Sequence, residues 1–190
     1  WSTNTDKLAV LGISDIAIDP SNTNIMYAAT GDGDAGDTYS VGVLKSIDGG
    51  NTWKITGLNW LITSGKNMNR IIINPDNTNI VFAASDNGIY RTLDGGDTWV
   101  RVLNITGIKD LEFKPGNPNT IYAAAASFYR STNGGTTFST ITSGLPGVGA
   151  AERLAIAVTL ADTNYVYVLA AKASDSGFLG VYRSTNSGAS

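Results

Sequence analysis

The sequence predicts an all-β chain built from four copies of one four-stranded unit, and three observations predict it. A short apolar segment that ends in Pro occurs at 16–20, 71–75 and 111–115, and at 156–160 with Leu in place of Pro. In every copy an aromatic residue follows that Pro, or Leu160, by seven positions. A glycine-rich turn followed by Trp or Phe closes the first three copies.

The first copy shows how the elements follow one another. Its first strand ends at Ile18, an Asp-Pro turn follows, and a second strand is expected over 24–29. A third strand over 42–46 ends in a cation and a hydroxyl residue, and a fourth begins at Trp53. These segments are rich in Ile, Val and Tyr and are bounded by Gly, Pro and Asn, which is typical of β-strands joined by tight turns.

Four strands in a period of about 40 to 50 residues indicate one blade of a β-propeller. The whole chain, 1–190, is interpreted as one propeller segment with four-stranded antiparallel blades. We expect the last strand of a preceding blade at 1–8, followed by repeats at approximately 12–56, 70–103, 110–142 and 154–190. A helix is needed nowhere, and only 150–154 allows one.

The glycine-rich turn has the pattern Ser/Thr-x-Asp-x-Gly-x-Thr-Trp. Glycine adopts backbone angles that other residues resist, an Asp side chain can accept hydrogen bonds from turn amides, and the aromatic residue can plug the sheet. The later copies carry Asn133 and Asn186 in place of Asp, which keeps the acceptor and removes the charge, so the pattern indicates a structural role. Its residues are Ser46, Asp48, Gly50 and Trp53, then Thr92, Asp94, Gly96 and Trp99, then Ser131, Asn133, Gly135 and Phe138.

This motif resembles the Asp-box, also called the BNR repeat, of the sialidase, sortilin and xyloglucanase-like propellers. The repeats are also similar to repetitive propellers of secreted proteins from Bacteroidetes-type bacteria. The resemblance implies a secreted or cell-surface location. Trp1 is in register with Trp53 and Trp99, and this register leaves two interpretations open. In the first, the chain is a fragment of a larger propeller of six to ten blades. In the second, it is a small closed ring in which Trp1 to about Lys7 completes the blade that begins at Ile156.

Composition excludes several kinds of chemistry. The chain has no His and no Cys, so it offers neither the usual general base nor thiolate chemistry. Its net charge of −3 argues against nucleic-acid binding. No apolar run approaches the roughly 18 residues of a membrane span. No cofactor is required.

The first repeat has an unusual acidic loop over 31–40, which contains Asp32, Asp34 and Asp37 among small residues. Three carboxylates in six positions could converge on Ca²⁺, which prefers oxygen ligands. A solvated loop and direct contact with a ligand are the alternatives.

A second irregular loop, over 57–70, carries Trp60, Asn67 and Arg70. Together with Tyr39 of the acidic loop, these residues are candidates for stacking on a sugar or docking a protein. The alternative is that Trp60 only anchors its own loop.

Every strong motif is therefore architectural, which favours a non-catalytic module that binds glycan or protein through its variable loops, with further blades of the same polypeptide as partners. The alternative is a glycoside hydrolase similar to the xyloglucan-cleaving propellers, with its catalytic segment partly outside the chain. Such enzymes use two carboxylates, and the weak candidates are Asp15, Asp32, Asp34 and, beside them, Asp37. A protein receptor of the sortilin or assembly-factor kind is a third hypothesis.

Overall fold

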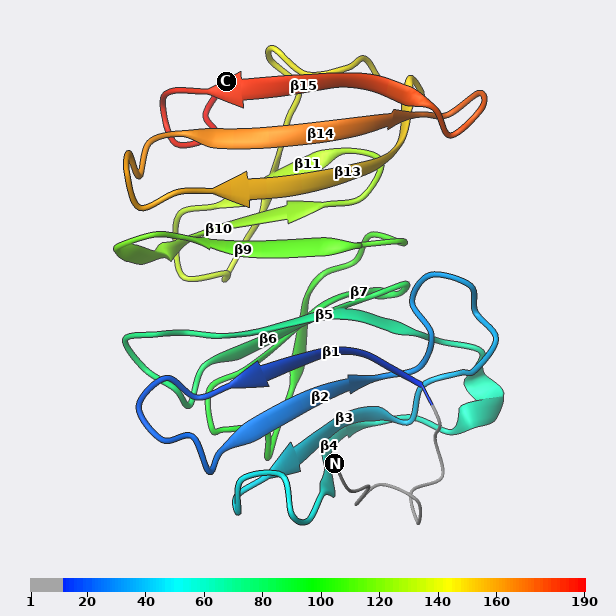
Figure 1. Cartoon of the computed structure of the whole chain (residues 1–190), viewed down its shortest axis with the longest axis vertical. Helices are drawn as coiled ribbons and strands as arrows, with labels where there is room; N and C mark the ends of the chain where they lie inside the picture. The colour runs from blue at the N-terminus through cyan, green and yellow to red at the C-terminus, as the bar shows by residue number, and fades with distance from the viewer. Residues whose placement is uncertain (1–11) are drawn as a thin grey trace. The chain divides into compact units, whose positions relative to one another are not determined.

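The computed structural model describes residues 12–190, so the strand predicted over 1–8 lies outside the described residues. These residues form four antiparallel sheets, here called blades 1 to 4, in which each strand pairs with the next in sequence (Figure 1). This is the up-and-down order of a propeller blade, and the predicted all-β propeller class is confirmed. Blades 1 to 3 have four strands and blade 4 has three.

The blades have the following strands. Blade 1 contains β1 (Ile13–Ile18), β2 (Met26–Thr30), β3 (Gly42–Ser46) and β4 (Lys54–Asn59); blade 2 contains β5 (Met68–Ile73), β6 (Val81–Ser85), β7 (Gly88–Thr92) and β8 (Val100–Leu103); blade 3 contains β9 (Asp110–Lys114), β10 (Asn117–Ala124), β11 (Phe128–Ser131) and β12 (Ser139–Ile141); and blade 4 contains β13 (Ala151–Val158), β14 (Val166–Lys172) and β15 (Phe178–Ser184). Among residues 12–190 the one helix is the short 3-10 turn η1 (Ile62–Ser64). No helix in this part of the chain is long and apolar enough to span a bilayer.

The stretch at 150–154, where the sequence allowed a helix, is instead the start of β13. Leu154 and Ile156 of this strand are buried in a core shared with blade 3. This burial outweighs the helix propensity of the Ala, Glu, Arg and Leu residues, because propensity is a weak local preference.

The chain divides into an N-terminal unit that ends at Ile105 and a C-terminal unit that begins at Thr106, each with two blades. In the N-terminal unit β1 lies against β5, and in the C-terminal unit β9 lies against β13. The two cores use equivalent positions. In the first unit the core contains Tyr27, Ala29 and Val43 of blade 1 with Ile71, Val81 and Ala83 of blade 2; in the second it contains Tyr122, Ala124 and Phe128 of blade 3 with Ile156, Val166 and Val168 of blade 4.

The strand register repeats as regularly as the sequence. The aromatic residue of the second strand pairs with the cation of the third strand in all four blades. These pairs are Tyr27 with Lys45, Phe82 with Arg91, Tyr122 with Arg130, and Tyr167 with Arg183.

The glycine-rich turn of blade 1, at 46–53, is held by its own side chains. Asp48 Oδ1 accepts hydrogen bonds from the Ser46 hydroxyl and the Thr52 N–H, both at 2.8 Å, and Oδ2 accepts one from the Thr52 hydroxyl at 2.6 Å. The Gly50 N–H donates to Ser46 Oγ at 2.9 Å. The bonds from Thr52, followed by the bond from Ser46, lower the pKa of Asp48 to about 2.

The other turns repeat this geometry with or without the charge. Asp94 accepts from the hydroxyls of Thr92 and Thr98, both at 2.6 Å, which lowers its pKa far below the ordinary value. Asn133 keeps the acceptor, and its amide donates to Thr137 Oγ1 at 2.8 Å. Asn186 donates to Ser190 Oγ in the same way at 2.8 Å. The turns with Asn have the same geometry as the turns with Asp. The Asp or Asn side chain of these turns therefore has a structural role, which is to hold the turn closed.

Candidate functional site

The acidic loop over 31–40 is a closed local structure. The Asp32 N–H donates to the Thr38 carbonyl at 2.8 Å, and the Gly36 N–H donates to the Asp32 carbonyl at 3.2 Å. The Asp32 carboxylate accepts from the N–H groups of Asp34 and Ala35, each at 3.0 Å. Asp32 therefore caps its own loop, in the way that Asp side chains stabilise turns.

The predicted convergence of three carboxylates does not occur. Among residues 12–190 there is no group of three or more Asp, Glu, His or Cys side chains that could hold a metal ion. The physical reason is local, since Asp32 points back to the amides of its own turn. Asp34 and Asp37 are exposed.

The same loop packs on the start of β5. The Ser14 hydroxyl donates to the Gly31 carbonyl at 2.8 Å and accepts from the Gly33 N–H at 3.0 Å. A Cβ on Gly33 would lie 2.5 Å from Asn69 Oδ1 and 3.0 Å from the Met68 carbonyl oxygen, so a larger residue would require the Asn69 side chain and the loop to shift. The loop is thereby positioned beside the second irregular loop of the same unit.

The loop over 57–70 places the predicted ligand residues at different depths. Trp60 is half-buried, meets Tyr90 edge to face at a centroid distance of 5.8 Å, and carries Lys66 Nζ 5.0 Å from its ring centroid. Tyr39 is exposed, and Asn67 is only 5% exposed. The Tyr39 ring is thus exposed, whereas Trp60 packs against the core of blades 1 and 2 and Asn67 lies beneath the acidic loop.

Asn67 joins the neighbouring loops through its main chain. Its carbonyl accepts from the Asp86 N–H at 3.0 Å, and the preceding Lys66 carbonyl accepts from the Ser40 N–H at 2.8 Å. Asn69 also donates to Asp86 Oδ1 at 3.0 Å. The contributions of Asp86 and Ser14 were not expected, because neither belongs to a repeated motif or an unusual loop.

Asp15, a candidate for catalysis, bonds blade 1 to blade 2. Its Oδ1 accepts from the N–H of Ile16 and its Oδ2 from the N–H of Ile71, both at 2.9 Å. Arg70 Nη1 lies 3.6 Å from Oδ2. Arg70, proposed as a ligand residue, is therefore paired across the same interface.

Asp110 repeats the geometry of Asp15 in the C-terminal unit. Its Oδ1 accepts from the Leu111 N–H at 2.9 Å and its Oδ2 from the Ile156 N–H at 2.7 Å. Two Asp residues at equivalent positions thus join adjacent blades through backbone amides. This repetition gives Asp15 an architectural explanation that needs no catalytic role.

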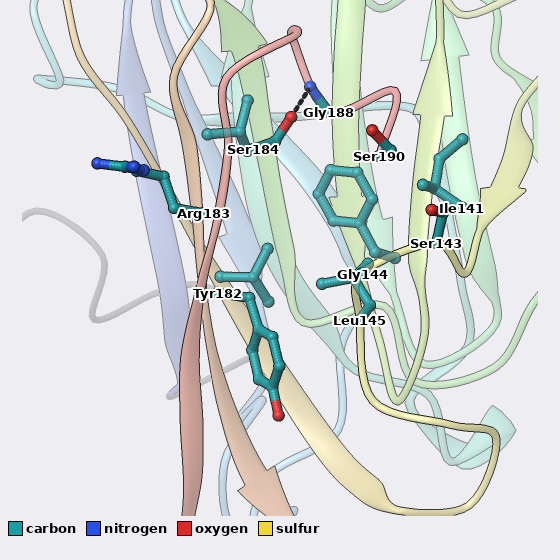
Figure 2. A pocket seen from close by; sticks show the side chains of 12 residues that line it. Ile141, Ser143, Gly144, Leu145, Tyr182, Arg183, Ser184, Gly188 and Ser190 are labelled. Atoms are coloured by element: carbon teal, nitrogen blue, oxygen red, sulfur yellow. Dashed lines mark hydrogen bonds between the residues drawn. The ribbon is translucent and has the colours of Figure 1, made fainter.

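Two hollows lie away from these loops. One, of about 760 Å³, lies beside the glycine-rich turns of blades 1 and 2 and is lined by Lys45, Asp48, Lys54 and Asp97 among others. The second, of about 50 Å³, lies in the C-terminal unit beside Leu145, Tyr182 and Ser190, as Figure 2 shows. Neither is lined by the predicted ligand-binding residues.

Comparison with known proteins finds xyloglucanases among the similar sequences. No family model matches the chain. It is 31% identical over 171 residues to the xyloglucanase Xgh74A of Acetivibrio thermocellus, which covers 72% of this chain and 20% of that protein. It is also 31% identical over 158 residues to a xyloglucanase of Paenibacillus sp, which covers 82% of this chain and 15% of that protein.

A solved structure agrees with these relatives. The crystal structure of an ancestral GH74 enzyme matches with a TM-score of 0.76 and 25% identity, covering 95% of this chain and 23% of that one. The chain spans about a fifth or less of the curated relatives that it matches. Over most of its length, therefore, this chain is similar to one part of the xyloglucanases and has the fold of a segment of a GH74 propeller.

Proposed function

We propose that the chain is a glycan-binding segment of a secreted glycoside hydrolase that acts on xyloglucan or a related β-glucan. The observation that carries this proposal is the 31% identity to xyloglucanases over 72% and 82% of the chain. We also assign its repeats to the Asp-box superfamily, on the basis of the four equivalent turns. Further blades of the same polypeptide would complete the propeller.

The loops of blades 1 and 2 would face the glycan. Tyr39 is exposed and Trp60 is half-buried, and aromatic rings provide flat apolar surfaces on which a sugar can stack. Asp34 and Asp37 add exposed carboxylates beside them. Asp34 and Asp37 are better placed than Asp15 and Asp32 to serve as an acid or base, because the latter two carboxylates hold backbone amides.

A direct binding experiment tests the proposal. The 190-residue chain is titrated calorimetrically with xyloglucan oligosaccharides, with cello-oligosaccharides and a sialoside for comparison. We expect binding to the β-glucans only, weakened roughly tenfold or more by Tyr39→Ala and Trp60→Ala, which corresponds to a loss of about 1.4 kcal/mol. Phe178→Ala, an exposed aromatic substitution in the other unit, is the control. Failure of the parent chain to bind any β-glucan would refute the proposal.

A second candidate is a non-catalytic glycan-binding segment, and the structural use of Asp15 and Asp32 favours it. Hydrolysis separates the two. Release of reducing ends by the chain, lost in Asp34→Asn or Asp37→Asn while binding persists, would place a catalytic carboxylate in the acidic loop. Binding without hydrolysis in the parent chain would support the non-catalytic candidate.

A further inference from the structure

A hollow of about 760 Å³ lies beside β4, the last strand in the sheet of blade 1 (Figure 1), and is here called the β4 hollow. Blade 1 lines it with β4 and the glycine-rich turn before that strand, and blade 2 lines it with its own glycine-rich turn. All of these segments belong to the N-terminal unit. Pockets that hold small ligands have volumes of roughly 300–1,000 Å³. The β4 hollow therefore has the size of a ligand pocket.

Two lysines line this hollow from neighbouring strands. Lys45 of β3 pairs directly with Lys54 of β4, so both side chains leave the same face of the sheet. Like charges that stand directly opposite each other across two strands destabilise the sheet. A negatively charged group bound between or beside the two ammonium groups would relieve this repulsion.

The repeat explains Lys45 but not Lys54. Every blade has a cation at the position of Lys45, and Lys45 Nζ donates to the Gly95 carbonyl of the next blade at 2.7 Å. The residue that pairs with this cation is Lys54 in blade 1, Val100 in blade 2 and Ser139 in blade 3. The blade architecture therefore does not require a second cation at this position.

The hollow is also lined by two carboxylates, and they differ in the same way. Asp48 accepts three hydrogen bonds inside its own turn, so its oxygens already have a structural use. Asp97 is exposed, and the equivalent turn positions in blades 1 and 3 are Asn51 and Thr136, so the turn does not require an acid there. Lys54 and Asp97 are thus charged residues of the hollow that the repeat does not explain.

The lining groups indicate what kind of ligand fits. Two lysines and two aspartates give the lining no net charge, so a dianion or a polyanion gains little overall attraction. A single carboxylate can accept charge-assisted hydrogen bonds from the Lys54 ammonium, while Asp97 accepts hydrogen bonds from hydroxyl groups. Ile47 and Ile55 are 67% and 49% exposed and add apolar surface. A uronic acid combines one carboxylate, several hydroxyl groups and an apolar ring face.

We propose that the β4 hollow is a second carbohydrate site, which binds a uronic acid residue of an acidic glycan. Lys54 binds the carboxylate, Asp97 and the Asn59 amide bind hydroxyl groups, and the two exposed isoleucines contact the ring. The residues proposed above for stacking on a neutral glycan do not line this hollow. The inference therefore goes beyond the proposed function, and either site can fail without the other.

Calorimetric titration of the 190-residue chain tests the proposal with three probes. These are a xylo-oligosaccharide that carries one glucuronic acid, the same oligosaccharide without the acid, and inorganic phosphate. We expect the acidic oligosaccharide to bind, and the neutral one and phosphate to bind roughly tenfold more weakly or not at all. The affinity for the acidic oligosaccharide should fall as salt is added, because salt screens exposed charges.

Variants of the hollow identify the groups that bind. Lys54→Gln should weaken binding of the acidic oligosaccharide roughly tenfold or more, and Asp97→Asn should weaken it less. Lys54→Arg, which keeps the charge, should retain most of the affinity. Lys172→Gln makes the same change at a partly exposed lysine of the other unit and should bind like the parent. Circular dichroism verifies that each variant is folded.

One further variant separates the two carbohydrate sites. Tyr39→Ala should lose affinity for neutral β-glucans and bind the acidic oligosaccharide like the parent, so failure at one site is visible without failure at the other. Absence of binding to the acidic oligosaccharide, equal binding of the acidic and neutral oligosaccharides, or full affinity in Lys54→Gln overturns the proposal. Phosphate binding as tight as that of the acidic oligosaccharide would make the hollow a general anion site and would overturn its assignment to a sugar.

Discussion

Asp110 should contribute measurably to stability, although it lies on no repeated motif. Asp110→Ala removes the acceptors of two backbone amides, those of Leu111 at 2.9 Å and Ile156 at 2.7 Å. A hydrogen bond to a charged group contributes about 1.5–3 kcal/mol. Since Asp110 is only partly buried, water can replace part of this loss, and we expect a destabilisation of about 2–3 kcal/mol.

The assay is urea unfolding followed by circular dichroism, with calorimetry as a second probe. For a unit of this size, 2 kcal/mol corresponds to a decrease in Tm of roughly 10 °C. Asp15→Ala should give a similar loss, since the nearby ion pair with Arg70 is partly exposed and adds little. Glu152→Ala, at an exposed residue of β13, makes the same charge change and should cost less than about 0.5 kcal/mol. An Asp110→Ala protein as stable as this control would refute the reasoning.

Acid should weaken the glycine-rich turn of blade 1, because the folded-state pKa of Asp48 lies at about 2, below its ordinary value of 3.8. The contribution of Asp48 to stability is therefore present above the ordinary pKa and is lost as pH falls toward 2. Tm measured between pH 6 and 2 should fall less steeply in Asp48→Asn, and parallel curves would contradict this. Gly57→Ala should destabilise the N-terminal unit by about 1–3 kcal/mol, because a Cβ would lie 2.1 Å from the Asp97 carbonyl oxygen. Urea unfolding measures this loss, and an unchanged unfolding curve would count against the close contact. Gly33→Ala should weaken oligosaccharide binding in calorimetry while shifting Tm little, since it displaces the acidic loop from Asn69. If the variant loses binding only because it unfolds, this expectation is wrong.

The repeat made much of each blade predictable. The spacing between Pro20 and Tyr27 recurs in every copy, and the structure places the aromatic of each copy opposite a cation of the next strand. Such features depend on residues close in sequence, joined by turns whose geometry is local. A one-residue error in register would have turned the apolar residues to the wrong face.

Contacts between blades were not predictable in the same way. Asp15 and Asp110 occupy equivalent positions, but Arg70 and Ala155 stand there in the other two copies, so the position did not stand out as a motif. The hydrogen-bond partner of each Asp is a main-chain amide more than 40 residues away in sequence. No pattern of local spacing indicates such a partner. In the acidic loop the spacing of the carboxylates did not indicate that Asp32 would accept hydrogen bonds from the amides of its own turn, and among residues 12–190 no three carboxylates converge there.

Several polar bonds between blades end on the main chain of the receiving blade, beside side-chain pairs such as Lys114 with Ser187 and Arg70 with Asp15. Asp15 accepts from the amide of Ile71, the Tyr27 hydroxyl donates to the carbonyl of Gly95, and the Gly57 amide donates to the carbonyl of Gly96. Every residue except Pro offers the same amide and carbonyl, so the identity of the receiving side chain does not affect these bonds. A duplicated or exchanged blade could therefore keep these main-chain bonds with its new neighbour without matching substitutions, provided that its backbone followed the same path.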